Sequence, residues 1–264
     1  MKFLSLVALS LSLLSVATGA PVADGAVAEG AVRLAKRQNS SYNDLMSYIS
    51  QLFTVDILMK DSALMIGLGE KAFAILAGFS TTENDLEEGR CGDVVVIFAR
   101  GTTEPGNVGA LAGPPLFEAL RQSLGIVGRT VAVQGVEYPA SFTGYLQGGD
   151  KAGSRQMANL VTQAFKQCPK SKIVMSGYSQ GGQVVHNAAK LLPAETMGNV
   201  SSVVIFGDPF SKYPVQGAAP NKVLVTCHLG DNICVNGDLI LLPHLTYLQD
   251  AMTAAAFIVA RAET

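Results

Sequence analysis

The sequence has no cluster of basic residues and no stretch in which aromatic and basic residues alternate. Proteins that bind nucleic acids usually gather Lys and Arg on one face, so we expect no nucleic acid as a partner. The chain has 264 residues and no internal repeat. This length is enough for one sizeable domain and requires no second core.

The sequence also lacks the ~20 consecutive apolar residues that a membrane-spanning helix needs. At the N-terminus, Lys2 is followed by the shorter apolar run FLSLVALSLSLLSVA and then by the small residues TGA. This order is typical of a secretory signal peptide, which we assign to residues 1–20; a membrane anchor is the alternative. We therefore expect a secreted, extracellular monomer without a stable membrane anchor.

Residues 21–37, PVADGAVAEGAVRLAKR, contain no aromatic residue and end in the dibasic pair Lys36-Arg37. Such a segment can bury little apolar surface, so we interpret it as a propeptide that is removed after Arg37. The remaining chain has 15 basic and 19 acidic residues, which makes it mildly acidic. Glycosylation sequons at Asn39 and Asn199 fit an extracellular protein.

The chain has four cysteines, and their spacing does not suit a zinc site. An even number in a chain with a secretory signal favours two disulfides, for which three pairings are open. Cys227 and Cys234 are close enough in the sequence to close a tight loop. That pairing would leave Cys91 and Cys168 for a long-range bond.

Near-continuous apolar runs alternate with segments whose apolar residues recur at helical spacing. The runs are bounded by Gly, Pro and Asp, as buried parallel strands are. They cover residues 93–100, 130–138, 171–179, 201–209 and 222–230. The order predicts an α/β fold: a three-layer α/β/α sandwich with a central, mostly parallel sheet of about five strands.

Ser179 lies in the pentapeptide Gly-Tyr-Ser-Gln-Gly, where a predicted strand ends and a helix begins. Only small residues fit at Gly177 and Gly181 in such a tight turn, and the serine hydroxyl stands at the sheet edge where reactive groups of α/β folds collect. The pentapeptide alone also occurs in turns with an idle serine. Its strand-to-helix context favours a nucleophile.

A serine hydroxyl becomes a strong nucleophile beside a base that a third group orients. The chain has three histidines. His186 follows Ser179 by about two helical turns, roughly 10 Å along the axis, which is too far for contact. His228 precedes the acids of its loop, against the order serine, acid, histidine. We therefore predict that His244, in LLPHLTY, is the base.

Three aspartates compete to orient His244: Asp208, Asp231 and Asp238. Turn chemistry alone could explain each of them. We select Asp231 because it follows the last predicted strand and lies between Cys227 and Cys234, whose disulfide would fix the carboxylate.

Acyl transfer also needs hydrogen-bond donors for the charge that develops on the carbonyl oxygen. The first should be the N–H of Gln180, the residue after the nucleophile. The second should come from the loop FARGTTEPGN, where Gly101 allows a turn and Thr102 offers an N–H and a hydroxyl. We predict no cofactor and no metal for this chemistry.

Four motifs in this order, FARGTTEPGN, GYSQG, CHLGDNIC and PHLTY, together with the places of Cys91 and Cys168, resemble the fungal cutinases. The resemblance covers residues 91–264 as a catalytic domain. It implies a small secreted serine esterase that hydrolyses cutin and related apolar esters through an acyl-enzyme. It further implies a triad, an oxyanion hole and two disulfides: Ser179, His244 and Asp231; Thr102 and Gln180; Cys91–Cys168 and Cys227–Cys234.

The sequence departs from this family in one site residue, because many members have serine where Thr102 stands. The added methyl group makes the orientation of that hydroxyl less certain. Apolar residues beside the base, with Ile240 and Leu245 as candidate substrate-binding residues, favour an acyl surface over a sugar. An acetylxylan-type esterase on the same scaffold is one alternative, and a secreted binding or effector protein with an idle hydrolase fold is another.

Residues 38–90 form an extension where many cutinases have a short lead. Charged residues such as Asp56 and Lys60 exclude a membrane span, and we expect extra N-terminal helices. They would pack either on the flank of the sheet as structural helices or across the mouth beside Ile240 and Leu245 as a lid. The methionines and glycines within residues 59–69 suit a segment that bends.

Overall fold

The computed structural model describes residues 57–263. The predicted signal peptide and propeptide, the sequon at Asn39 and the first part of the predicted extension lie outside this range. Between residues 57 and 263, no helix is long and apolar enough to cross a bilayer.

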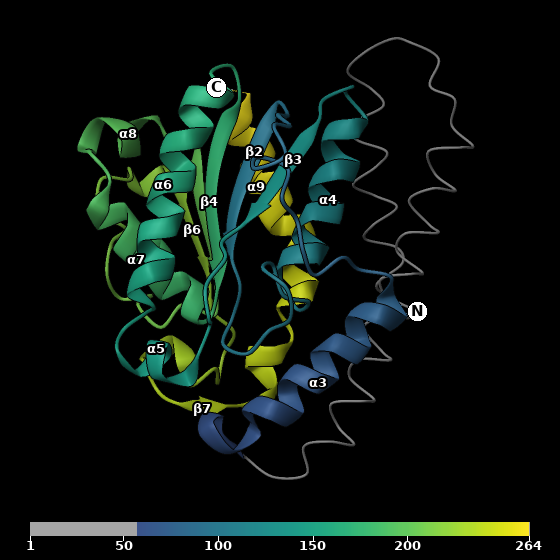
Figure 1. Cartoon of the computed structure of the whole chain (residues 1–264), viewed down its shortest axis with the longest axis vertical. Helices are drawn as coiled ribbons and strands as arrows, with labels where there is room; N and C mark the ends of the chain where they lie inside the picture. Colours follow the sequence, from purple (N-terminus) through teal and green to yellow (C-terminus); the bar gives the residue numbers. More distant parts are fainter. Residues whose placement is uncertain (1–56, 264) are drawn as a thin grey trace. The chain divides into compact units, whose positions relative to one another are not determined.

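The centre of the fold is a five-stranded sheet in which all neighbouring strands are parallel (Figure 1). The strand order is β3-β2-β4-β5-β6. Its members are β2 (Val94–Ala99), β3 (Val131–Gly135), β4 (Lys172–Tyr178), β5 (Ser202–Phe206) and β6 (Val223–Thr226). Every residue of β2 and β5 is buried, because helices cover both faces of a parallel sheet. The predicted α/β sandwich with about five parallel strands is confirmed.

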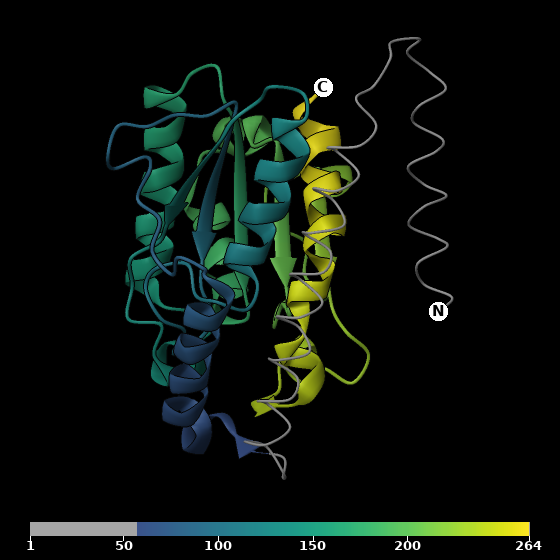
Figure 2. The same ribbon diagram turned by 90° about the vertical axis from the view of Figure 1, so that its right-hand side faces the viewer.

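Two helical layers enclose the sheet (Figure 2). On one face, α4 (Gly113–Gly125) packs beside α9 (Ala251–Ala262). On the other, α6 (Lys151–Gln167) packs beside α7 (Gln180–Leu191). Because side chains alternate along a strand, β2 serves both layers: Phe98 belongs to the core under α4 and α9, and Ile97 to the core under α6 and α7.

Short elements complete the described chain. They are the helices α5 (Phe142–Leu146) and α8 (Ala194–Asn199) and the 3-10 turns η1 (Pro220–Lys222), η2 (Ile233–Val235), η3 (Leu242–Leu245) and η4 (Tyr247–Asp250). The sequon residue Asn199 is exposed at the end of α8. Its glycosylation stays a prediction.

An N-terminal strand and helix precede the sheet. Strand β1 (Ile57–Leu58) pairs antiparallel with β7 (Leu239–Ile240), and α3 (Met59–Ala77) follows it directly. Near the end of α3, Phe73 and Ala74 are buried in the core that α4 and α9 cover. The final turns of α3 are therefore part of the scaffold, while β1 lies against the segment that leads to His244.

Two disulfides are present, with the pairing that the family resemblance implies. Cys91–Cys168 ties the chain before β2 to the end of α6. Cys227–Cys234 closes a loop directly after β6, at the carboxyl edge of the sheet.

Candidate active site

Ser179 is the one residue between β4 and α7, and its backbone is strained, with φ 57° and ψ −121°. A non-glycine residue in such a conformation costs about 1–3 kcal/mol and persists when its surroundings enforce it. Here the flanking glycines allow close packing: a Cβ on Gly181 would lie 1.9 Å from the carbonyl oxygen of Ala99. A Cβ on Gly177 would lie 2.5 Å from the carbonyl carbon of Gly181. Only glycine fits at either position.

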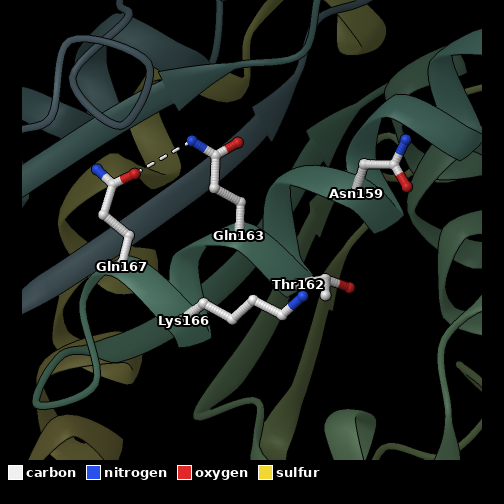
Figure 3. Close-up of a pocket in the computed structure, with 5 residues that line it drawn as sticks. All are labelled: Asn159, Thr162, Gln163, Lys166 and Gln167. Carbon is white, nitrogen blue, oxygen red and sulfur yellow. Dashed lines mark hydrogen bonds between the residues drawn. The ribbon is translucent and has the colours of Figure 1, made fainter.

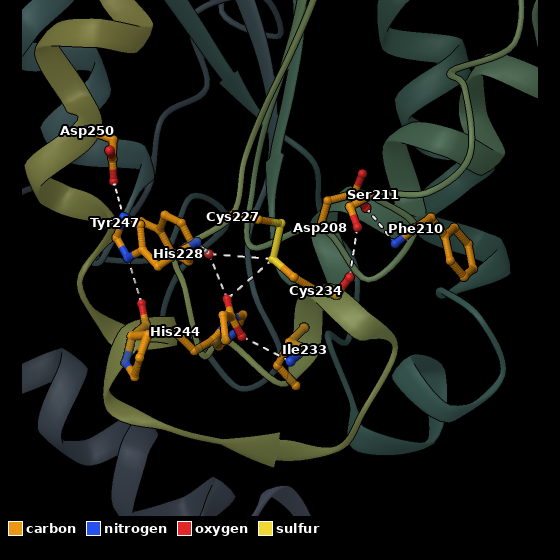
Figure 4. The surroundings of a disulfide bond; sticks show 12 residues. Asp208, Phe210, Ser211, Cys227, His228, Ile233, Cys234, His244, Tyr247 and Asp250 are labelled. Carbon is orange, nitrogen blue, oxygen red and sulfur yellow. Dashed lines mark hydrogen bonds and ion pairs between the residues drawn. A yellow bond between two sulfur atoms is a disulfide. The ribbon is translucent and has the colours of Figure 1, made fainter.

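His244 and Asp231 form a buried hydrogen-bonded pair. Figure 4 shows His244 near the Cys227–Cys234 disulfide, with Tyr247 and Ile233. Asp231 Oδ2 lies 2.8 Å from His244 Nδ1 and accepts a hydrogen bond of 2.6 Å from the hydroxyl of Tyr247. Its other oxygen accepts the N–H of Ile233 over 2.9 Å. Burial raises the pKa of Asp231, but the hydrogen bonds and the attraction of His244 outweigh it, so the pKa lies below its ordinary value. The carboxylate is held charged and oriented.

The backbone between β5 and the next loop brings the serine and the histidine to the same edge. Phe206 O accepts the N–H of Ser179 over 2.9 Å. The following residue, Gly207, has φ 57° and leaves room for the imidazole, since a Cβ there would lie 2.7 Å from His244 Cε1. Within residues 57–263 no hydrogen bond joins Ser179 Oγ to His244, whose Nδ1 contacts Asp231 and whose carbonyl oxygen accepts from Tyr178.

The two predicted oxyanion residues contact each other. Gln180 Nε2 donates to Thr102 Oγ1 and to the carbonyl oxygen of Ser141, both over 2.8 Å. Because Thr102 Oγ1 accepts this bond, its own hydrogen can point to another acceptor. Both side chains are buried, which fixes them before a substrate arrives.

A buried carboxylate that sequence reasoning missed shapes the loop of Thr102. Glu104 Oε2 accepts the N–H of Gly101 over 2.7 Å, and Oε1 accepts the N–H groups of Ala110 and Leu111 over 2.9 and 3.0 Å. Burial raises the pKa of Glu104 and the three amides oppose that rise. A glutamate in an otherwise small and polar loop was the available signal. Its role required knowledge of which amides surround it.

The other candidate residues lie apart from this pair. His186 is buried and contacts Asp208 over 2.9 Å, and within the described chain no hydrogen bond joins Asp208 to His244. Asp238 lies in the loop before β7. Ile240 is half-buried on β7, whereas Leu245 is 4% exposed and packs in the core. Substrate binding by Ile240 and Leu245 stays a prediction.

Two further features of the described chain bear on other kinds of site. Between residues 57 and 263, no group of three or more His, Cys, Asp or Glu side chains could hold a metal ion. A surface pocket on the second half of α6 is lined by amides, one hydroxyl and one amine, without a carboxylate or an imidazole (Figure 3); its residues are Asn159, Thr162, Gln163, Lys166 and Gln167. This end of α6 leads into the start of β4, so the pocket lies at the sheet edge opposite to Ser179.

A parallel sheet between two helical layers, with a serine in a strained strand-to-helix turn and a His–Asp pair at the same edge, defines the α/β-hydrolase class. The family model named Cutinase matches residues 90–262. Cutinase pbc1 of Pyrenopeziza brassicae is 53% identical over 208 residues, which make up 78% of this chain and 100% of that protein. The chain belongs to the cutinase family, and it is a carboxylic ester hydrolase.

Solved structures add to this assignment. A Trichoderma reesei cutinase in complex with a C11Y4 phosphonate inhibitor is 49% identical, with a TM-score of 0.71 over 82% of this chain and 97% of that one. An acetylxylan esterase is 22% identical, with a TM-score of 0.51 over 65% of this chain and 99% of that one. The second likeness shows a shared fold alone.

Proposed function

We propose that this protein is a secreted serine esterase that hydrolyses ester bonds of cutin and related apolar esters through an acyl-enzyme. The observation that carries the proposal is the 2.8 Å contact between His244 Nδ1 and Asp231 Oδ2, at the edge where Ser179 stands in its strained turn. A carboxylate accepts only, so Nδ1 carries the hydrogen. Nε2 is then left with a lone pair, as a base requires.

In the proposed acylation step, Ser179 Oγ bonds to the ester carbonyl carbon while its proton passes to His244 Nε2. The imidazolium is stabilised by the charged Asp231, and it then gives the proton to the leaving alcohol as the C–O bond breaks. Deacylation repeats the sequence with water as nucleophile and Ser179 as leaving group. Nothing in this cycle requires Asp231 to take up a proton, which agrees with its lowered pKa.

The N–H of Gln180, the N–H of Thr102 and the Thr102 hydroxyl are the proposed donors to the developing oxyanion. The Gln180 side chain supports this role, because its bond to Thr102 Oγ1 turns the hydroxyl hydrogen away from Gln180. Threonine in place of the serine common in the family thus retains a directed donor. Loss of one such donor typically costs ~2.7–4 kcal/mol in the transition state.

Apolar surface near His244 supports an acyl substrate. Leu229 is fully exposed in the disulfide loop, and Leu242, two residues before the base, is 48% exposed. Apolar side chains that gather beside a site offer contacts to an apolar partner. An acetylxylan-type esterase would need polar groups for a sugar there. This contrast favours cutin-like esters over acetylated xylan.

The proposal of secretion rests on the N-terminal pattern and on the two disulfides, since disulfides persist in oxidising compartments.

We also propose that β1 and the first turns of α3 act as a lid. The backbone pair Ile57–Ile240 supports this, as does the approach of Gly67 to the oxyanion loop: a Cβ there would lie 3.0 Å from Thr103 O. Because Phe73 is part of the core, the moving part would be the start of the helix.

Labelling with an alkyl phosphonate tests the proposed chemistry. The wild-type protein should take up one equivalent at Ser179, located by peptide mass spectrometry, and Ser179→Ala should take up none. A series of p-nitrophenyl esters from acetate to palmitate, run beside cutin and acetylated xylan, then tests the substrate. No labelling would mean an idle fold, and activity confined to acetyl groups with release from xylan would favour the acetylxylan alternative.

A further inference from the structure

His228, which sequence reasoning set aside as a base, lies at the back of the proposed catalytic pair. It follows Cys227 directly and stands on the same disulfide loop as Asp231. Its ring is partly buried, with 18% of the side chain exposed. Figure 4 shows the ring between Asp250 and the disulfide, beside Tyr247. Nothing in the proposed acyl transfer uses this histidine.

Both ring nitrogens of His228 contact the segment that carries His244. Nε2 lies 2.6 Å from Asp250 Oδ2, and Nδ1 lies 2.9 Å from the carbonyl oxygen of Pro243, the residue before His244. Thr246 Oγ1, 3.0 Å from Nδ1, donates its hydrogen to the same carbonyl. Pro243 O and the Asp250 carboxylate can only accept. A ring with one hydrogen therefore keeps one of the two links, and a ring with two hydrogens keeps both.

His228 is also linked to Asp231 indirectly, through Tyr247. The His228 ring stacks on the ring of Tyr247, with 4.2 Å between centroids and 20° between planes. The backbone N–H of His228 donates to the Tyr247 hydroxyl over 3.1 Å. That hydroxyl is the one that donates to Asp231 Oδ2. His228 thus contacts Pro243, the residue before His244, and also Tyr247, the residue that donates a hydrogen bond to Asp231.

We propose that His228 is a positioning residue that fixes the distance and angle between Asp231 and His244. This inference rests on the proposed triad. The disulfide loop and the 243–250 segment are separate stretches of chain. His228, on the loop, joins that segment at Pro243, near its start, and at Asp250, at its end. Small errors in such alignment are costly, since a misplacement of about 1 Å can lower a rate about 100-fold.

Three substitutions separate the contacts. His228→Ala removes the stack and both ring links. His228→Asn places an amide donor near the position of Nδ1, where it can still donate to Pro243 O, while His228→Gln extends to the position of Nε2 and can donate to Asp250. Because Pro243 adjoins the base, we expect His228→Asn to keep most activity and His228→Gln to keep less. His228→Ala should lower kcat about 10- to 100-fold with KM nearly unchanged.

Asp85→Asn is the matched control for lost stability. Asp85 accepts the N–H of Val133 and pairs with Arg90 at β3, the edge strand opposite to β6. It should lower Tm and leave kcat as in the wild type. In the His228→Ala variant, the acid limb of the kcat/KM profile should also move to lower pH, because a misaligned Asp231 stabilises a protonated His244 less.

Phosphonate labelling of the wild type keeps the two proposals distinguishable. If the wild type is not labelled, the proposed function fails and this inference fails with it. If the wild type is labelled and His228→Ala or His228→Gln loses only Tm, as Asp85→Asn does, the positioning role alone is wrong. Where His228→Ala does not fold, equal kcat in the His228→Asn and His228→Gln proteins would overturn the role, and the expected difference would support it.

Discussion

The ring of Tyr178 stacks on the imidazole of His244, with 5.0 Å between centroids and 26° between planes, and the Tyr178 hydroxyl donates to the carbonyl oxygen of the same histidine over 2.8 Å. Tyr178 is the residue before Ser179 and is buried. The last residue of β4, directly before the proposed nucleophile, therefore contacts both the ring and the backbone of the proposed base, His244. This contact links two segments that lie 66 residues apart.

Substitutions at Tyr178 separate these two contacts. Tyr178→Phe keeps the stack and loses the hydrogen bond, which should cost about 0.5–1.5 kcal/mol of unfolding free energy and lower kcat a few-fold. Tyr178→Leu also loses the stack and should lower kcat further with little change in KM. Thermal unfolding and steady-state hydrolysis of a short ester measure both effects. A Tyr178→Leu protein with wild-type kcat would show that the stack does not position His244.

Thr102 provides the sharpest test of the oxyanion hole. Thr102→Val keeps the shape and removes the hydroxyl, so kcat should fall by about 100-fold with KM little changed, because the donor acts on charge that develops in the transition state. Thr102→Ser should keep most activity. Gln180→Glu, which replaces the donor to Thr102 Oγ1 by an acceptor, should also lower kcat. Equal losses of kcat in the Thr102→Val and Thr102→Ser variants, or an effect on KM alone, would show that the loop of Thr102 has only a structural role.

Much of this architecture was predictable because its signals are local. A parallel strand covered on both faces must be apolar throughout, so Val94–Ala99 and its neighbours were evident in the sequence. Gly177 and Gly181 mark a turn that only glycine permits. With three histidines and a fixed order of residues, few combinations of base and acid remained.

The contacts that orient these residues were not predictable, because they depend on how distant segments pack. Tyr178 and Tyr247 act on His244 and Asp231, which the fold brings near them. Glu104 binds amides of its own loop, and the course of that loop is not evident from the sequence. The pairing of β1 with β7 involves two residues on each side, too few for a recognisable pattern. His228 was weighed only as a base, and its acid, Asp250, follows it by 22 residues.

The pH dependence of hydrolysis follows from the charge state of the pair. Burial raises the pKa of Asp231, but the interactions with His244, Tyr247 and Ile233 together outweigh it and lower the pKa, so the carboxylate stays charged in moderate acid. His244 must be neutral to accept a proton from Ser179, because a protonated imidazole has no lone pair to offer. kcat/KM should therefore be low in acid and rise toward neutral and alkaline pH. A profile already maximal at pH ~4 would exclude His244 as the base.

Glu70 on α3 makes stability depend on pH in the opposite sense from a salt-bridged acid. Burial, and then the charge of Glu104, raise its pKa well above the ordinary value, and its Oε2 accepts no hydrogen bond within the described chain. Between the pKa values of the unfolded and folded states, the folded protein binds more protons. Its stability is therefore full below the unfolded pKa of ~4.3 and falls as pH rises through the folded pKa.

Glu70→Gln removes this titration and keeps the shape of the side chain. The variant should unfold at a higher temperature than the wild type at neutral and alkaline pH, by about 2–4 °C for each kcal/mol recovered. The difference should shrink toward pH ~4, where the wild-type carboxyl is protonated in both states. Calorimetry across this range measures the effect. A difference in Tm that does not change with pH would show that Glu70 does not titrate in this way.

The proposed lid can be tested by a covalent tether, since Leu58 and Leu239 are directly opposite in the β1–β7 pair. Residues opposite each other in an antiparallel pair have Cβ atoms about 4.5–5.5 Å apart, which is close to what a disulfide allows. The oxidised Leu58→Cys/Leu239→Cys protein should hydrolyse long-chain esters at least several-fold more slowly than either single variant and should lose any stimulation by detergent. Acetate esters, which need less room, should be affected less.

Deletion of α3 would be a poorer test, because it would remove Phe73 from the core. Equal rates for the tethered and single-cysteine proteins on both classes of ester would assign β1 and α3 to the scaffold.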